Sequence, residues 1–235
     1  GVKIYGNTFQ NTSTSMNTSD RGRGIVSFDA SYIADELCTS GTIPCTSTIT
    51  NTFKGLYYGI NSENIFSDKP VTIRNNVFKD NTKGILLKAV NKATITSNNF
   101  TATPLDNGIY LYACNAYQVE ENHFSSLYAG IVVKNSGIDF NEIYNNKFEN
   151  VNIGIQAQGI NGQYATLVRP EDYTEIHLAS GLKIKCNENI NSGSADIAVT
   201  TGMIYPQQGY CSSDKTTPAS NIFWKPSTFY LTLCC

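Results

Sequence analysis

The sequence has little charge and no long apolar run, and each absence excludes a class of function. Only 15% of the 235 residues are charged and the net charge is −2, so the basic surface typical of nucleic-acid-binding proteins is missing. No apolar stretch approaches the roughly 18 residues of a membrane-spanning helix, and no signal-peptide pattern is present. We therefore expect no nucleic-acid partner and no membrane span.

Helix-favouring residues are also scarce. Leu, Glu and Arg are few, whereas Asn, Thr, Ser and Gly are abundant and the chain holds 14 Tyr and 11 Phe. This balance favours strands and turns over helices. The length is enough for one domain with a substantial core.

Cysteine, in contrast, is frequent for a cytosolic protein, with seven residues. Cys38 and Cys45 close a short loop rich in turn-forming residues, and no CxxC pair or nearby His completes a zinc site. We expect a disulfide between them and an oxidising, extracytoplasmic location.

One motif recurs along the chain: an apolar residue, an asparagine three residues later and a phenylalanine two residues after that. Its clear copies are Ile4–Asn7–Phe9, Ile73–Asn76–Phe78, Ile95–Asn98–Phe100, Val119–Asn122–Phe124 and Ile143–Asn146–Phe148. Weaker copies are Asn51–Phe53, Ile184–Asn187 and Asn221–Phe223. A Gly-Ile pair recurs at Gly24, Gly59, Gly84, Gly108, Gly130 and Gly154. The four regular asparagines are 22, 24 and 24 residues apart, a period typical of solenoid proteins.

The apolar residues within each unit alternate, as in Ile85 and Leu87. Period-two alternation indicates strands with one buried face. Leucine-rich repeats share the period, but the leucine grid and helical segment that they need are missing. The sequence therefore predicts an all-β solenoid, a single-stranded parallel β-helix of about eight coils about 4.8 Å apart.

The repeated residues are expected to stack in columns along this solenoid. Asparagine amides can bond neighbouring main chain at bends and can also form ladders along the axis. The phenylalanines stack inside, and the glycine before each isoleucine supplies a backbone shape that other residues reach poorly. The predicted structural stack is Asn76, Asn98, Asn122 and Asn146 with Phe78, Phe100, Phe124 and Phe148.

The unit I-x-x-N-x-F…G-I-x-L resembles the right-handed parallel β-helix repeats of bacterial secreted and cell-surface proteins. Together with the right-handed preference of parallel crossovers, the resemblance implies a right-handed helix. The tail, GLKIKCNENI followed by YPQQGYCSSDKTTPASNIF, is similar to segments of large surface proteins of gliding bacteria. That likeness implies export by the type IX secretion system, with translocon components as partners.

We expect one β-helix domain over residues 1–235, with insertions at 10–23, 29–50 and 159–181 and irregular coils over 191–235. The chain starts inside a repeat unit and stops on the strand-like run FYLTLCC. Terminal solenoid repeats normally need a polar cap. The prediction is that the chain is a segment of a longer protein, in contact with flanking domains.

Catalysis finds little support. Glycoside hydrolysis needs two carboxylates about 5–9.5 Å apart, and the outward positions of successive coils give no adjacent pair. We interpret Glu121 and His123 as a solvated surface pair, and Glu171, Asp172 and His177 as part of a salt-bridged loop, the one place where lyase chemistry would be sought. We expect no catalytic residue, no metal and no cofactor, although distant turns that converge would still allow an enzyme.

A binding surface is the better candidate. Leu86, Tyr110 and Val132 are expected to line up as an apolar lateral stripe, and Tyr112, Tyr57 and Tyr58 could stack on sugar rings beside it. The alternative is that an insertion covers the stripe. The preferred function is a structural or adhesive segment of a secreted bacterial surface protein that presents loops and this stripe to a polysaccharide or a cell-surface protein. Alternatives are a carbohydrate-active β-helix enzyme, a polysaccharide lyase or glycoside hydrolase, and a trimeric receptor-binding rod.

Overall fold

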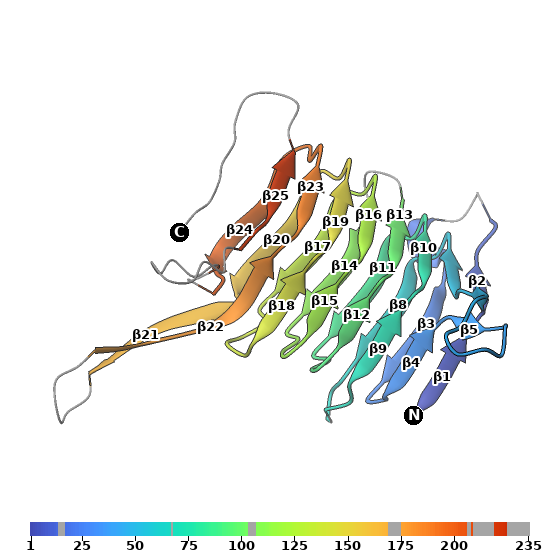
Figure 1. Ribbon diagram of the computed structural model, residues 1–235, viewed down its shortest axis with the longest axis horizontal. Helices are drawn as coiled ribbons and strands as arrows, with labels where there is room; N and C mark the ends of the chain where they lie inside the picture. The colour runs from blue at the N-terminus through green and yellow to red at the C-terminus, as the bar shows by residue number, and fades with distance from the viewer. Residues whose placement is uncertain are drawn as a thin grey trace.

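The computed structural model describes residues 1–13, 17–66, 68–102, 107–168, 175–205, 208 and 219–224. Its strands form three long sheets whose members stack side by side along one axis (Figure 1). Each coil of the chain contributes one strand to each sheet in turn. Neighbouring coils pair in parallel, as with Phe78 opposite Phe100 and Ile85 opposite Ile109.

The three sheets contain eight, eight and seven strands. The first sheet consists, in spatial order, of β1 (Val2–Tyr5), β4 (Tyr32–Asp35), β9 (Val71–Arg74), β12 (Thr94–Thr96), β15 (Gln118–Glu120), β18 (Asn141–Tyr144), β22 (Glu175–Lys185) and β21 (Gly162–Val168). The second consists of β2 (Thr8–Gln10), β7 (Thr52–Lys54), β10 (Val77–Lys79), β13 (Asn99–Thr101), β16 (His123–Ser125), β19 (Lys147–Glu149), β23 (Glu188–Ile190) and β25 (Ile222–Trp224). The third consists of β24 (Ala195–Met203), β20 (Ile153–Ile160), β17 (Ala129–Lys134), β14 (Asn107–Tyr112), β11 (Lys83–Lys88), β8 (Tyr58–Glu63) and β3 (Arg23–Phe28).

This arrangement confirms the predicted parallel β-helix. The described residues form seven coils with a strand in every sheet, and β25 begins an eighth. Their one helical element is the short 3₁₀ helix η1 (Thr18–Asp20), within the stretch 10–23 that was predicted to be an insertion.

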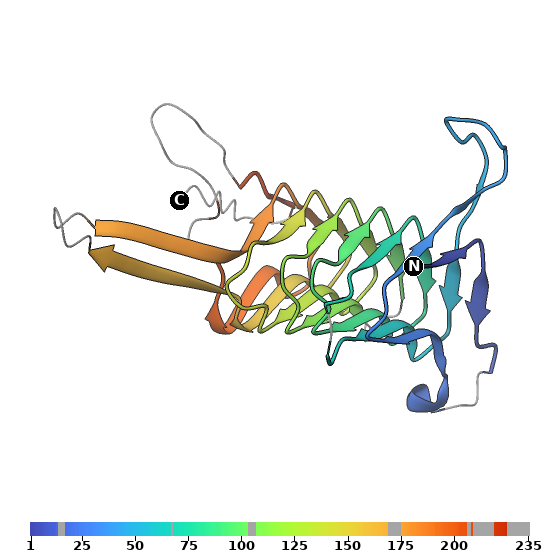
Figure 2. The ribbon, with the colours of Figure 1, turned by 90° about the horizontal axis from the view of Figure 1, so that it is seen from below.

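Two predicted insertions contain more regular structure than the sequence indicated. Strand β4 lies within 29–50. Its Tyr32 and Ala34 point into the core, although this unit lacks the Asn-x-Phe motif. The rest of that stretch carries a small antiparallel hairpin of β5 (Leu37–Cys38) and β6 (Thr48–Ile49). The stretch 159–181 contains β21 and most of β22, an antiparallel hairpin that extends away from the stack (Figure 2).

The region 191–235 is also more regular at its start than predicted. Strand β24 is nine residues long and pairs in parallel with β20. Beyond Tyr205, only residues 208 and 219–224 are described.

A continuous asparagine ladder runs along one corner of the helix. In Asn98, the amide Nδ2 donates to Ile73 O at 2.9 Å and to Asn122 Oδ1 at 3.0 Å, while its Oδ1 accepts from Asn76 Nδ2 at 2.9 Å. The same side-chain bond links Asn7, Asn51, Asn76, Asn98, Asn122, Asn146, Asn187 and Asn221 in series. The ladder therefore includes the weak copies of the motif as well as the four regular ones.

The left-handed backbone at this corner belongs to the residue before seven of the eight ladder asparagines; Thr50, before Asn51, is the exception. Those seven residues have φ between 50° and 64°: Gly6, Asn75, Ser97, Glu121, Asn145, Cys186 and Ser220. The ladder asparagines themselves act only as hydrogen-bonding groups. The unusual backbone angles predicted for them are adopted by the residues that precede them.

The phenylalanines form one stacked column in the interior. Ring centroids of successive coils are 4.7–4.9 Å apart with interplanar angles of 5–9°. The column comprises Phe9, Phe53, Phe78, Phe100, Phe124 and Phe148. Burial of each such side chain contributes about 1.5–3 kcal/mol.

The glycines of the Gly-Ile pairs are required for space, which corrects the predicted reason. Gly108 has no positive φ, but a Cβ there would lie 2.6 Å from the Phe124 ring and 2.6 Å from the carbonyl oxygen of Gly130. Gly59 and Gly84 face the phenylalanine of the next coil in the same way. Five of the six glycines therefore make room for a stacked ring, whereas Gly154 faces Asn189.

Candidate functional site

The outward side of the third sheet gathers the predicted binding residues. Tyr58 lies on β8, Leu86 on β11, and Tyr110 and Tyr112 on β14. In the parallel register, Leu86 is opposite Tyr110, and Tyr110 is opposite Val132 of β17. Vertical stacking thus places residues from separate repeats side by side on one rigid surface.

The apolar part of this stripe is less accessible than predicted. Val132 is only 3% exposed and packs with Ala129 and Ile153 in a small cluster on the outer side of the sheet. Tyr110 packs against the same cluster. Val132 is therefore a support for the Tyr110 ring and is not itself available for contact, while Leu86 and the tyrosines are half-buried.

Basic side chains lie beside these rings, and the predicted surface did not include Arg23 or Lys83. The Arg23 guanidinium carbon is 5.3 Å from the Tyr58 ring centroid. Lys83 Nζ is 5.6 Å from the same centroid and 5.8 Å from that of Tyr110. Lys134 Nζ is 6.0 Å from the Tyr112 centroid. All four distances are within the range of cation–π attraction.

Tyr57 and Tyr58 form a close aromatic pair at one side of this surface. Their ring centroids are 4.3 Å apart and their planes are tilted by 38°. Burial raises the pKa of Tyr58 to about 12, and its hydrogen bond to Tyr57 adds to the shift. The Tyr58 hydroxyl thus stays protonated at neutral pH and is a stable hydrogen-bond donor.

A pair of carboxylates on the first sheet was missed in the sequence. Glu120 of β15 and Glu142 of β18 lie on adjacent strands and both point outward. Partial burial raises the pKa of Glu120, and the charges of Glu142 and Glu121 add to this shift. Lys185 Nζ is 3.6 Å from Glu142 Oε1. In the strand register Glu120 stands opposite Tyr144, so a comparison of equivalent repeat positions does not reveal the diagonal neighbour Glu142.

Glu121 and His123 do not pair with each other. His123 Nε2 lies 2.9 Å from Glu149 Oε2, and Glu121 accepts a hydrogen bond from Ser97 at 3.3 Å. Hydrogen bonds from Lys147 and then from His123 lower the pKa of the Glu149 carboxyl. The predicted loop residues Glu171 and Asp172, and the side chain of His177, lie outside the described part of the structure.

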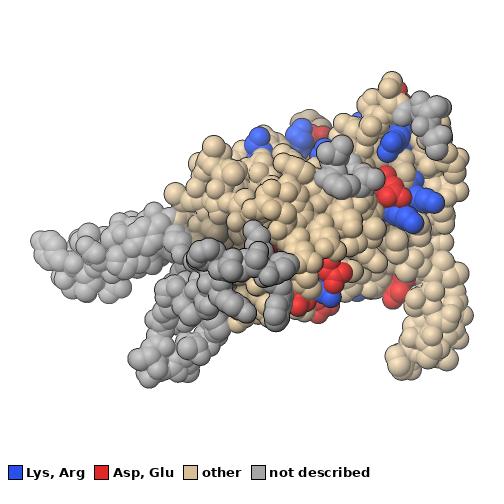
Figure 3. Space-filling model, turned by 90° about the horizontal axis from the view of Figure 1, so that it is seen from above, with Lys and Arg blue, Asp and Glu red and all other residues tan. Residues whose placement is uncertain are grey.

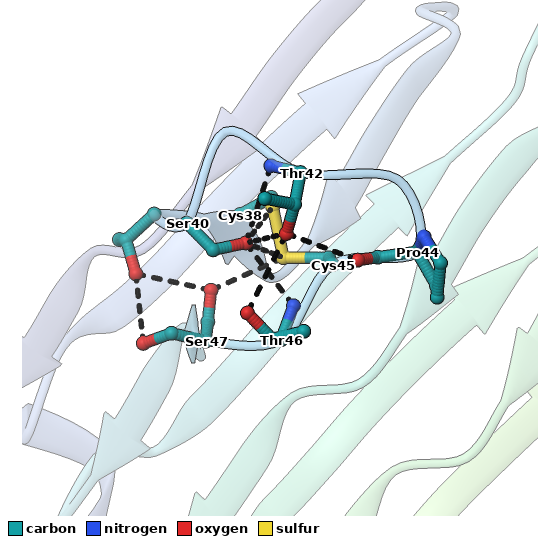
Figure 4. Close-up of a disulfide and its surroundings, with 8 residues drawn as sticks. Cys38, Ser40, Thr42, Pro44, Cys45, Thr46 and Ser47 are labelled. Carbon is teal, nitrogen blue, oxygen red and sulfur yellow. Dashed lines mark hydrogen bonds between the residues drawn. A yellow bond between two sulfur atoms is a disulfide. The ribbon is translucent and has the colours of Figure 1, made fainter.

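The predicted disulfide between Cys38 and Cys45 is confirmed (Figure 4). It closes the β5/β6 hairpin, where Ser40 Oγ accepts hydrogen bonds from Thr42 Oγ1 at 2.9 Å and from the Thr46 amide at 3.1 Å. Disulfides are typical of proteins outside the reducing cytoplasm.

The described residues contain no group of three or more His, Cys, Asp or Glu placed to hold a metal ion. Cys114 is fully buried, and burial raises the pKa of its thiol to about 12. Metal ligation needs a deprotonated thiolate, so Cys114 is poorly suited to that role.

Within the described chain, no helix has the length and apolar character of a membrane span. A family model described as periplasmic copper-binding protein (NosD) matches residues 46–177, which is more than half of the chain. Comparisons with curated proteins and with solved structures gave no match. The matched residues include the four regular repeats, the tyrosines Tyr57, Tyr58, Tyr110 and Tyr112, and the carboxylates Glu120 and Glu142. The chain therefore belongs to the NosD family of right-handed parallel β-helix proteins.

Proposed function

We propose that the chain is a scaffold of a secreted bacterial cell-surface protein that binds glycan on the outward side of its third sheet. The observation that carries this proposal is the group of Tyr57, Tyr58, Tyr110 and Tyr112, which one rigid sheet holds with half-buried rings. Aromatic rings with a polar tip suit sugars, because the ring covers the apolar face of a pyranose and the hydroxyl bonds its edge.

The rigidity of the sheet favours binding. Tyr58, Tyr110 and Tyr112 sit on strands that pair on both sides, and Tyr110 is fixed further by its contact with the Val132 cluster. A surface that is ordered before the ligand arrives loses less conformational entropy on binding. The same features fit an adhesive segment that needs no moving part.

Copper, which the family description names, is not supported by the described residues. Copper sites use Cys, Met and His ligands, yet Cys114 is buried with a raised thiol pKa and His123 is paired with Glu149. No third ligand stands near either residue among those described. The proposed function therefore does not involve copper.

Location outside the cytoplasm follows from the family description and agrees with the Cys38–Cys45 disulfide. Display at the cell surface and export by the type IX system form the finer part of the proposal. Their support is the likeness of residues 181–223 to segments of large surface proteins of gliding bacteria. Fractionation of cells with and without a functional type IX translocon tests this part, and unchanged export would refute it.

The test of glycan binding is an array screened with the wild-type protein and with the Tyr110→Ala/Tyr112→Ala double variant. We expect the double variant to bind at least about tenfold more weakly, which corresponds to about 1.4 kcal/mol. Tyr144→Ala is the matched control, because Tyr144 is 39% exposed and lies on the first sheet. Unchanged binding by the double variant, with its melting temperature preserved, would refute the proposed surface.

A glycoside hydrolase is the second candidate, and Glu120 with Glu142 is the observation that favours it. A carboxylic acid with a raised pKa can act as general acid beside an ionised partner. Reducing-sugar release across a polysaccharide panel, repeated with Glu120→Gln, tests this alternative. Turnover that disappears in Glu120→Gln would replace the scaffold proposal with an enzyme.

A further inference from the structure

We infer that the ligand of the third-sheet surface is an acidic polysaccharide, whose sugar rings carry carboxylate or sulfate groups. The inference rests on the proposed glycan-binding function and adds the chemical class of the ligand. It is carried by the basic side chains that alternate with the tyrosine rings on this surface.

The central element is Lys83, which lies between two rings. Its ammonium group is 5.6 Å from the Tyr58 centroid and 5.8 Å from the Tyr110 centroid. Arg23 approaches Tyr58 at 5.3 Å from the next strand. Cation and ring therefore alternate in the order Arg23, Tyr58, Lys83, Tyr110 across four adjacent strands.

Lys134 and Tyr112 add a further cation–ring pair at the other end of these strands, because Tyr112 stands opposite Lys88, five residues beyond Lys83. Lys134 is opposite Tyr112 in the register of β14 and β17, and its Nζ is 6.0 Å from the ring centroid. Strands in a sheet are about 4.8 Å apart, so the five strands from β3 to β17 span about 19 Å. A surface of that length can contact several consecutive sugar rings.

The cations of this row have no carboxylate partner among the described residues. The ion pairs in the described part of the chain do not involve Arg23, Lys83 or Lys134. Glu63 of β8 is in the same register position as Lys88, Tyr112 and Lys134, and it already pairs with Lys88. Within the described part of the chain, three positive charges on this side are thus left without an ion-pair partner, in a protein whose net charge is −2.

This concentration of charge is local. On the face drawn in Figure 3, Lys and Arg form small separated groups on a mostly uncharged surface. Lys54 and Lys79 are neighbours on the second sheet and are also exposed, but the cation–π contacts of the described residues do not involve either of them. The combination of cation and ring belongs to the third sheet.

Each part of the row matches one part of an acidic sugar. A tyrosine ring covers the apolar face of the pyranose, while the neighbouring ammonium or guanidinium group bonds its carboxylate or sulfate. Neutral glycans would use only the rings and would leave the cations without an anion. Charge complementarity therefore favours the acidic class.

The test compares two matched pairs of polymers by calorimetry: polygalacturonate against its fully methyl-esterified form, and dextran sulfate against dextran. We expect the wild-type protein to bind at least one acidic polymer about tenfold more tightly than its neutral counterpart. The pair that shows the difference identifies carboxylate or sulfate as the group recognised. The difference should shrink in 1 M NaCl, where screening is strong.

Lys83→Gln should remove most of this preference for the acidic polymer. Lys79→Gln is the control, since it removes the same charge from a surface without rings. Equal losses in the two variants would show nonspecific charge attraction and would overturn the inference. Equal binding of acidic and neutral polymers would overturn it too but keep the proposed function, whereas an absence of all glycan binding would refute both.

Discussion

At the scale of single residues, the chain depends on side chains whose hydrogen bonds are completely used. The side-chain Nδ2 of Asn122 donates to Ile95 O, Glu120 O and Asn146 Oδ1. The side-chain Oδ1 of Asn122 accepts from the backbone N–H and from the Nδ2 of Asn98. All of these groups lie in a buried corner where water does not replace a lost partner. An asparagine at this position is therefore worth more than its propensity for strands or turns suggests.

Asn122→Ala should lower the free energy of unfolding by about 3 kcal/mol, because it leaves several buried donors and acceptors without partners. Urea unfolding followed by circular dichroism measures the change. Asn99→Ala is the control, since Asn99 is exposed on β13 and should change stability by less than about 0.5 kcal/mol. Similar values for the two variants would contradict the role given to the ladder.

Cys114 should resist alkylation in the folded protein. Its thiol is fully buried and its pKa is raised to about 12, so almost no thiolate exists at pH 8. Peptide mapping after iodoacetamide treatment should find Cys114 unmodified in buffer and modified in urea, while the partly exposed Cys186 reacts in both. Rapid modification of Cys114 in buffer would show that the core opens at this coil.

At the scale of strands and coils, the aromatic column is interrupted in the seventh coil. Asn189 stands opposite Phe148 on one side and Phe223 on the other. It is fully buried, and neither polar atom of its side chain has a hydrogen-bond partner. Gly154 still leaves the space that a ring would use, as Gly130 does for Phe148. This coil therefore lacks the packing of its neighbours.

Asn189→Phe should raise the free energy of unfolding by about 1–3 kcal/mol, because a stacked ring replaces a buried amide without partners. Thermal unfolding measures the gain, with Glu188→Phe as a control on the outward side of the same strand. A loss of stability in Asn189→Phe would mean that the amide is satisfied by bound water and that the column ends at Phe148.

The sequence predicted the elements well wherever the repeated motif is present. The strands, the ladder and the phenylalanine column all follow from period and alternation. Strand β4 was missed because Tyr32 and Ala34 carry the core without the asparagine and phenylalanine of the motif. Strict alternation also failed to predict the position of Lys83. Gly84 and Ile85 are both buried, so the period of two is broken there and Lys83 points outward beside the tyrosines.

Exposure was harder to predict than position. Val132 lies in the predicted register, but its burial depends on Ala129 and Ile153, which belong to different positions of the repeat. In the same way, Glu142 stands diagonally from Glu120. The two glutamates occupy different positions of the repeat, so the pair is found only when neighbouring positions are compared as well as equivalent ones. Contacts across columns depend on side-chain direction and on corner geometry, and a single repeated motif does not encode these.

At the scale of the whole molecule, stacking coils converts scattered residues into a continuous surface. Arg23 and Lys134 are more than a hundred residues apart in sequence but lie on the same sheet of adjacent strands. In a solenoid each coil contacts its neighbours directly, so the row is as rigid as the ladder and the aromatic column beneath it. A long, ordered surface of this kind suits an extended polymer.

The most direct measurement is a crystal structure of the protein with an acidic oligosaccharide. The account predicts sugar rings over Tyr58 and Tyr110, with a carboxylate or sulfate group within hydrogen-bond distance of Lys83 Nζ. Sugar bound instead across Glu120 and Glu142 on the first sheet would contradict it and would point to hydrolysis.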